Sequence, residues 1–197
     1  MFSERELEYK PISVKEALVK MKDIAMLIVD LSLAAVIFRD KELANNVLRL
    51  SKEMDRLIYS LQISIMLTAR DAEDARALQS ILQVALATEK ISDAASQIAT
   101  PILKGLEPHP ILLEGLKRLD EPIIAVEVNP KSILCKKYND RKRLRTKLGV
   151  DIIAIRRSEK WLVDMNGVSK IMPNDTIIAR GEDTGISKLK ELAAGGV

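Results

Sequence analysis

The feature that most constrains this chain is the apolar stretch over residues 24–38, IAMLIVDLSLAAVIF, whose one charged residue is Asp30. A helix needs about 20 consecutive apolar residues to cross a hydrocarbon core of roughly 30 Å. This stretch is shorter and is bounded by Asp23 and Arg39, and a carboxylate near the bilayer centre costs at least about 2.5 kcal/mol. We therefore predict a buried helix of a soluble, cytoplasmic protein rather than a membrane span.

Apolar residues recur at alternating intervals of three and four between residues 13 and 100, which is the period of helices with one buried face. Three segments follow one another, and each begins at a residue suited to an N-cap: Ser13, Asp40 and Asp71. We expect helices that end at residue 38, near residue 70 and before Pro101. Near-equal helices with short connections predict an antiparallel three-helix bundle. The first is apolar nearly all round, which predicts either a central helix with two neighbours or an additional homo-oligomer surface.

The pattern changes after a connector rich in Gly and Pro, residues 104–122. Four short β-rich runs follow, separated by turn residues; they are residues 122–128, 150–157, 160–165 and 175–181. A basic helix over residues 138–149 connects the first two runs and can bring their strands parallel, and a final helix covers residues 184–196. We predict two domains, a helical bundle with its connector over 1–118 and a small α+β domain over 119–197.

Several classes of chemistry are excluded by what the chain lacks. It has one cysteine, Cys135, and one histidine, His109, so an internal disulfide, a multi-thiolate zinc site and a histidine-based catalytic cluster within one chain are excluded. Neither a Gly-x-Gly-x-x-Gly fingerprint nor a Gly-Lys-Ser/Thr phosphate loop occurs. We therefore predict a protein that is not an enzyme and does not bind NAD.

One group of carboxylates could hold a metal ion. Glu89 and Asp93 are four residues apart, so they project from one face of the third helix and could share a hard cation. Asp55 lies in the middle of the second helix and could face this pair across the bundle. The alternative is a solvated helix edge, on which Lys90 compensates Asp93.

The segment over residues 131–147 holds eight Lys or Arg residues against one acid. Such charge could attract nucleic acid, anionic lipid headgroups or a phosphate-bearing ligand, or it could be a solvated helix face. Its one aromatic residue is Tyr138, which does not make a platform on which single-stranded bases stack. We do not expect nucleic acid as a partner.

Arg156 and Arg157 end an apolar strand and could grip a small anionic ligand through bidentate hydrogen bonds. The alternative is pairing with nearby acids of the chain itself: Asp151, Glu159 or Asp164.

Residues 13–105 resemble one three-helix repeat of the PhoU family. The motifs that carry the resemblance are RDKELANNVL with KEMDRL, and ATEKISDAA, in which an acid is followed four residues later by Asp. In that family such motifs can hold metal clusters on the bundle surface. The resemblance therefore implies a divalent or iron ion at Asp55, Glu89 and Asp93.

Residues 122–192 resemble the C-terminal domain of TrkA-type regulators, the RCK-C domain of potassium channels and transporters. The resemblance rests on IAVEVNPKSILCKKY, on GVDIIAIRR followed by KW, and on IMPNDTIIARGEDTGISKLKEL, in which Asp175 and Gly181 stand at the usual positions. Some relatives bind small ligands at the dimer cleft of this domain, which would implicate Arg156 and Arg157.

Together the two resemblances imply a cytoplasmic, non-catalytic regulator of cation transport, with potassium as the cation. Such a protein would form a homodimer or higher homo-oligomer, sense a small ligand or ion, and lie at the membrane periphery through a channel or transporter partner. The alternative is a metal-binding, PhoU-type adaptor in phosphate signalling.

Overall fold

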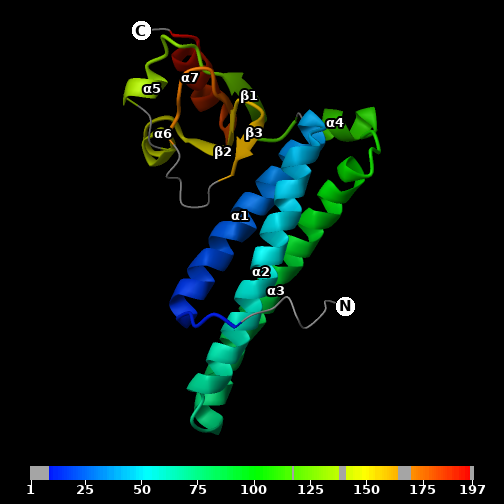
Figure 1. The fold of residues 1–197 in the computed structure, drawn as a ribbon, viewed down its shortest axis with the longest axis vertical. Helices are drawn as coiled ribbons and strands as arrows, with labels where there is room; N and C mark the ends of the chain where they lie inside the picture. Colours follow the sequence, from blue (N-terminus) through cyan, green and yellow to red (C-terminus); the bar gives the residue numbers. More distant parts are fainter. Residues whose placement is uncertain (1–8, 117, 138–140, 164–169, 196–197) are drawn as a thin grey trace.

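A computed structural model describes residues 9–116, 118–137, 141–163 and 170–195. Three long helices come first: α1 (Val14–Phe38), α2 (Lys41–Thr68) and α3 (Ala72–Leu103). They lie side by side in alternating directions, so the predicted antiparallel three-helix bundle is confirmed (Figure 1). The short helix α4 (Pro110–Leu116) follows. Within the described residues, no helix combines the length and the apolar character that a membrane span requires.

The helix starts follow from local capping. The side chains of Ser13, Asp40 and Asp71 each accept hydrogen bonds from backbone N–H groups two or three residues later, at 2.8 to 3.2 Å. The three predicted starts are therefore confirmed. The predicted end of the third helix is wrong, because α3 continues through Pro101 to Leu103. A proline in the last turn removes one N–H, and the carbonyl left without it belongs to Gln97, an exposed residue that water can reach.

A four-stranded sheet follows the bundle. Its strands are β1 (Ile123–Glu127), β2 (Val150–Arg157), β3 (Lys160–Leu162) and β4 (Thr176–Gly181), in the order β1-β4-β2-β3. Every pairing is antiparallel. The expected parallel pair does not form: β1 and β2 run in the same direction, but β4 lies between them. The central place suits β4, because both of its faces are buried.

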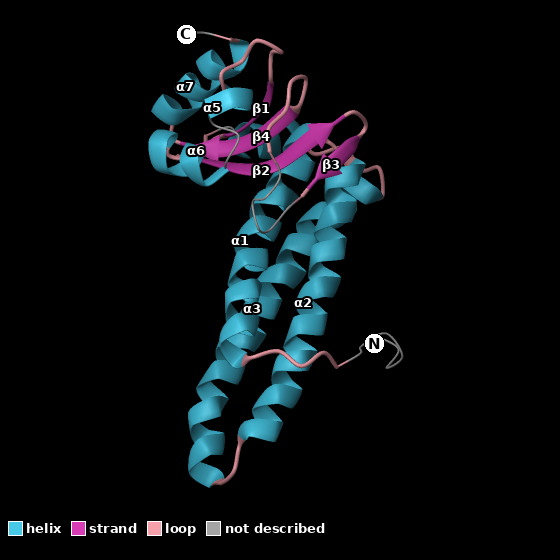
Figure 2. Cartoon of the chain, turned by 60° about the vertical axis from the view of Figure 1, so that its left-hand side comes forward, coloured by secondary structure: helices cyan, strands magenta, loops and turns pink. Residues whose placement is uncertain are grey.

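The sheet separates two apolar cores. The helices α5 (Leu134–Lys137), α6 (Arg141–Leu148) and α7 (Asp183–Ala194) lie with the sheet at one end of the long bundle (Figure 2). Along β4, Ile177 and Ala179 belong to the core of these helices, whereas Ile178 between them belongs to the core of the bundle. This alternation is the two-residue period of a strand. The sequence-predicted α+β domain is thus confirmed, although residues 138–140 and 164–169, parts of a predicted helix and strand, lie outside the described residues.

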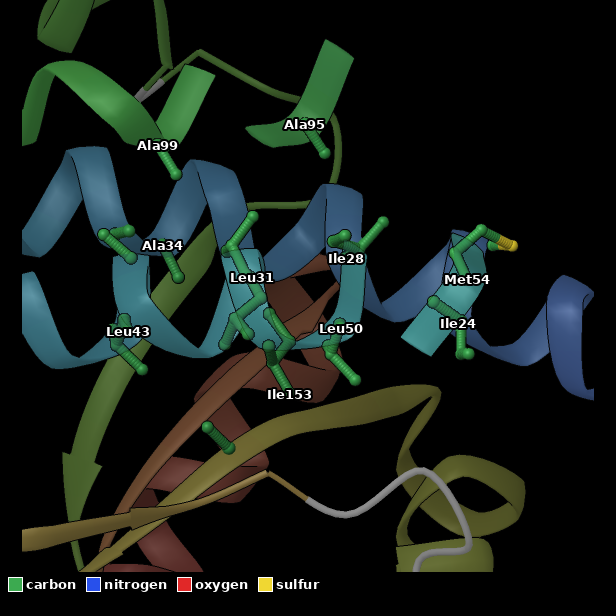
Figure 3. Close-up of a cluster of buried hydrophobic side chains, with 14 of the residues drawn as sticks. Ile24, Ile28, Leu31, Ala34, Leu43, Leu50, Met54, Ala95, Ala99 and Ile153 are labelled. Atoms are coloured by element: carbon green, nitrogen blue, oxygen red, sulfur yellow. The ribbon is translucent and has the colours of Figure 1, made fainter. Parts of the chain in front are cut away.

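Helix α1 is central because three elements cover it. Its apolar side chains contact α2, α3 and the sheet, and they share one core with Ile153 of β2 (Figure 3). The helical members labelled in the figure are Ile24, Ile28, Leu31 and Ala34 from α1, Leu43, Leu50 and Met54 from α2, and Ala95 and Ala99 from α3. The expectation of a central helix is confirmed, and the sheet is the third neighbour that explains its width. The predicted domain boundary between residues 118 and 119 lies in the connection between α4 and β1.

Candidate functional site

Two polar contacts fix the sheet to the bundle, and we call them together the interdomain joint. In the first, the indole Nε1 of Trp161 donates to Asp40 Oδ2 at 2.8 Å, and the backbone N–H of Trp161 donates to Glu42 Oε1 at 3.1 Å. Asp40 is also the N-cap of α2, whose N–H groups bind its other oxygen. One carboxylate therefore both starts a helix of the bundle and holds strand β3.

The second contact of the joint is an arginine among three acids. Nη1 of Arg180 lies 2.7 Å from Asp30 Oδ1, its Nε lies 3.1 Å from Glu121 Oε2, and its Nη2 lies 3.7 Å from Asp151 Oδ2. Burial raises the pKa of Asp30; the charge of Arg180 lowers it by a smaller amount, while Asp151 and Glu121 add to the increase. Nε of Arg145 lies 3.4 Å from the other oxygen of Asp151, Oδ1, so two guanidinium groups face three carboxylates. With all three acids ionised, the cluster holds one excess negative charge.

Only one partner of this contact could be predicted from the sequence. Asp30 stood out as the one charge within an apolar helix, but its partner lies 150 residues away in β4. Arg180 follows a run of apolar residues in β4 and resembles any arginine at a strand end. A lone charge on a buried helix face is a usable signal that a buried partner exists, because burying an unpaired carboxylate is costly.

The structure brings the three predicted metal ligands into electrostatic contact. Burial raises the pKa of Asp55, and the charge of Asp93 raises it further. Burial likewise raises the pKa of Glu89, with the charges of Asp93 and then Asp55 adding to it. The carboxyl groups from α2 and α3 therefore repel one another, as the prediction that Asp55 faces the pair requires.

These carboxylates do not converge on one point, however. No group of three or more His, Cys, Asp or Glu side chains is arranged to hold a metal ion among the residues that the structure describes. Carboxylate oxygens are suitable donors for a hard cation, but in this conformation the set does not form a ligand shell. The metal site at Asp55, Glu89 and Asp93 stays a prediction.

Arg157 is held by a buried acid. Its Nε donates to Asp175 Oδ1 at 2.9 Å and its Nη2 donates to Oδ2 at 2.8 Å, while Nη2 also donates to the carbonyl of Lys170 at 2.7 Å. The hydrogen bonds to Asp175 raise the pKa of Arg157 above its ordinary value. Asp175 accepts a further bond from the backbone N–H of Met172. The anticipated pairing of this arginine with an acid therefore occurs, but with an acid that sequence reasoning did not consider.

Arg156 lies differently. Its guanidinium carbon is 5.5 Å from the centre of the Trp161 ring, within range of a cation–π contact. Both arginines line a pocket of about 430 Å³ at the end of β2, together with Glu127, Asn174 and Asp175 among others. The structure thus places the two predicted ligand-binding residues at one pocket, in which Arg157 is occupied by Asp175 and Arg156 is exposed.

The fold and these sites define a helical-bundle protein with an appended α+β domain and a charged joint between the two. Residues 18–102, which include most of α1, all of α2 and all of α3 except Leu103, match the family model of the PhoU domain. No curated protein matches the chain. Similarity to a PhoU domain suggests a regulatory or adaptor role in phosphate or ion transport signalling, and it is consistent with a protein that is not an enzyme.

Proposed function

We propose that this protein is a cytoplasmic, non-catalytic regulator of cation transport, with potassium as the cation. The observation that carries the proposal is the interdomain joint, which links the sheet domain to the bundle through a shared apolar core and two polar contacts. Regulation requires that an event at one site changes the energy of another. The resemblance of residues 122–192 to the TrkA-type domain supports potassium as the cation.

Signal transmission has a short physical route in this proposal. Arg156 lines the pocket at the end of β2 and lies over the Trp161 ring. Trp161 in turn donates to Asp40, the N-cap of α2. A small anionic ligand that draws Arg156 away from the indole would therefore alter the contact that holds the start of α2. In a homodimer, the bundles would carry this change to a membrane channel or transporter at the membrane periphery.

The test is a potassium uptake assay in cells that lack the protein, compared with cells that receive the wild type or Trp161→Phe. Phenylalanine keeps an aromatic ring for Arg156 but removes the N–H that binds Asp40. We expect altered uptake in the deletion, restoration by the wild type and incomplete restoration by the variant. Equal uptake with and without the protein would refute the proposal.

A phosphate-signalling adaptor that binds a metal ion is the second candidate. The mutual repulsion of Asp55, Glu89 and Asp93, which a cation would relieve, favours it. Metal analysis of the purified protein should then show bound divalent or iron ions that the double variant Glu89→Ala, Asp93→Ala loses. Equal metal content in the two proteins would dismiss this site.

A further inference from the structure

Helix α3 has a second apolar face that the bundle does not use. We call it the α3 seam: its eight residues recur at alternating intervals of three and four, are all exposed, and include no charged side chain. They are Ala77, Ser80, Val84, Ala87, Ile91, Ala94, Ile98 and Pro101. This spacing is that of the a and d positions of a heptad repeat. The residues that α3 buries in the bundle are others: Ala85, Ser92, Ala95, Ala99 and Ile102.

The large side chains of the seam are strongly exposed. Val84, Ile91 and Ile98 keep 60%, 46% and 41% of their surface open to solvent. Val84 and Ile91, together with Met26 of α1, border a groove of about 570 Å³ between α1 and α3. Arg180 is its one lining residue from the sheet domain among the described residues, and Figure 1 shows that domain on the side of the bundle away from α3. Contiguous exposed apolar surface of this kind marks a protein contact.

The sizes of the seam residues indicate which partner fits. The a row is Ala77, Val84, Ile91 and Ile98, and the d row is Ser80, Ala87, Ala94 and Pro101. In an antiparallel helix pair, the a row of one helix faces the d row of the other. When two copies of α3 are aligned over the whole seam, the facing pairs are Ala77 with Pro101, Ser80 with Ile98, Val84 with Ala94, and Ala87 with Ile91. Each Val or Ile meets a smaller residue, as interdigitated packing requires.

The available area is sufficient for a specific dimer. At 1.5 Å per residue the seam is about 37 Å long, and a helix about 10 Å wide gives roughly 370 Å² from α3. The α1 residues that line the groove lie between Leu18 and Asp30, and this length of about 20 Å adds roughly 200 Å². Two copies together would bury roughly 1,100 Å², which exceeds the roughly 1,000 Å² expected of a biological interface.

We propose that a second copy of this chain packs antiparallel along the α3 seam, so that the bundles form an isologous dimer with its two-fold axis between Ala87 and Ile91. The seam is then complementary to itself, which a two-fold interface requires. The proposal concerns assembly through the bundle and goes beyond the proposed function, because it does not depend on any transport partner or on a contact through the sheet domain.

Disulfide cross-linking of the full chain tests the orientation. In a Cys135→Ser background, one protein carries Val84→Cys and another carries Ala94→Cys. In the aligned antiparallel pair these positions face each other, so the mixture should give a cross-linked dimer of the two proteins under mild oxidation. Val84→Cys alone should not cross-link, because ten residues separate the two copies by about 15 Å along the axis, beyond the roughly 7 Å limit for Cα atoms in a disulfide.

A change in mass tests the seam itself. Ile91→Glu places a charge in the interface, and we expect light scattering to show half the mass of the wild type at the same concentration. Gln79→Glu, on another exposed face of α3, is the matched control and should keep the wild-type mass. Thermal unfolding checks that both variants are folded, which the exposure of Ile91 in the monomer leads us to expect. Unchanged mass in Ile91→Glu, or self-cross-linking of Val84→Cys, would overturn the proposal.

Discussion

The hydrogen bond between the Trp161 indole and Asp40 should contribute measurably to stability, and replacing Asp40 with Ala is the direct perturbation. This change removes the N-cap of α2, which costs about 1 kcal/mol. It also leaves the indole N–H of a side chain that is 9% exposed without its charged acceptor, which adds about 1.5–3 kcal/mol. We therefore expect the free energy of unfolding to fall by about 2.5–4 kcal/mol.

Asp71→Ala is the matched control. Asp71 caps α3 through the same two backbone N–H contacts, both at 2.9 Å, and it is exposed. Its loss should cost only the cap, about 1 kcal/mol. A double-mutant cycle between Asp40→Ala and Trp161→Phe isolates the indole bond, because it cancels what each change does alone.

Urea unfolding supplies the measurement. Circular dichroism follows the helices in all four proteins of the cycle. Trp161 is the only tryptophan of the chain, so its fluorescence additionally follows the interdomain joint in the wild type and in Asp40→Ala. We expect a coupling energy of about 1.5 kcal/mol or more between the two changes. A coupling energy below about 0.3 kcal/mol, the error of such additivity tests, or an equal loss in Asp40→Ala and Asp71→Ala, would refute the reasoning.

Three further perturbations test other contacts. The raised pKa of Asp30 means that the folded carboxyl group binds a proton more tightly than the unfolded one, so its contribution to stability is lost as pH rises from 3.8 through the folded value. Asp30→Asn should therefore make the free energy of unfolding, measured between pH 4 and 7, fall less steeply with pH. A steeper fall in the variant would contradict the assignment. Arg157→Ala strands the buried carboxylate of Asp175 and should lower stability by about 3–5 kcal/mol in chemical unfolding; a loss below about 1 kcal/mol would show that the pair is not structural. Gly185→Ala would place a Cβ against a carbonyl oxygen at the end of α6 and should lower stability by about 1–3 kcal/mol in thermal unfolding. Gly115 has open space around it, so Gly115→Ala is the control and should cost little. Equal effects of the two changes would refute the steric overlap at Gly185.

Local features of the fold could be predicted from the sequence. The caps at Ser13, Asp40 and Asp71 were predictable because a cap side chain binds N–H groups two or three residues away. Helix periodicity and the short β-rich runs were informative for the same reason, since each pattern describes neighbours along the chain. Pro101 misled the prediction because a proline in a final turn does less damage than one in a helix interior.

Long-range pairing could not be predicted in this way. The insertion of β4 between β1 and β2 depends on which strand buries both faces, and the contact of Trp161 with Asp40 joins residues 121 positions apart. The candidate sites show the same division. The spacing of Glu89 and Asp93 predicted that both lie on one face of a helix. Only the structure shows that Arg157 donates two hydrogen bonds to Asp175. Complementary charges recur too often along a chain for spacing alone to select the true pair.

Helix α1 lies between the other two bundle helices and the sheet, and this position limits whether the two domains can be expressed separately. Helices α1 and α2 contribute to the bundle core and, through Ile153 and Trp161, to the contact with the sheet. A fragment that ends at residue 118 would therefore carry an uncovered apolar strip along these helices, and it should aggregate unless the strip is made polar. A recombinant exchange of either domain would succeed only if the incoming partner brought a matching apolar surface, so the two domains are constrained to change together during evolution.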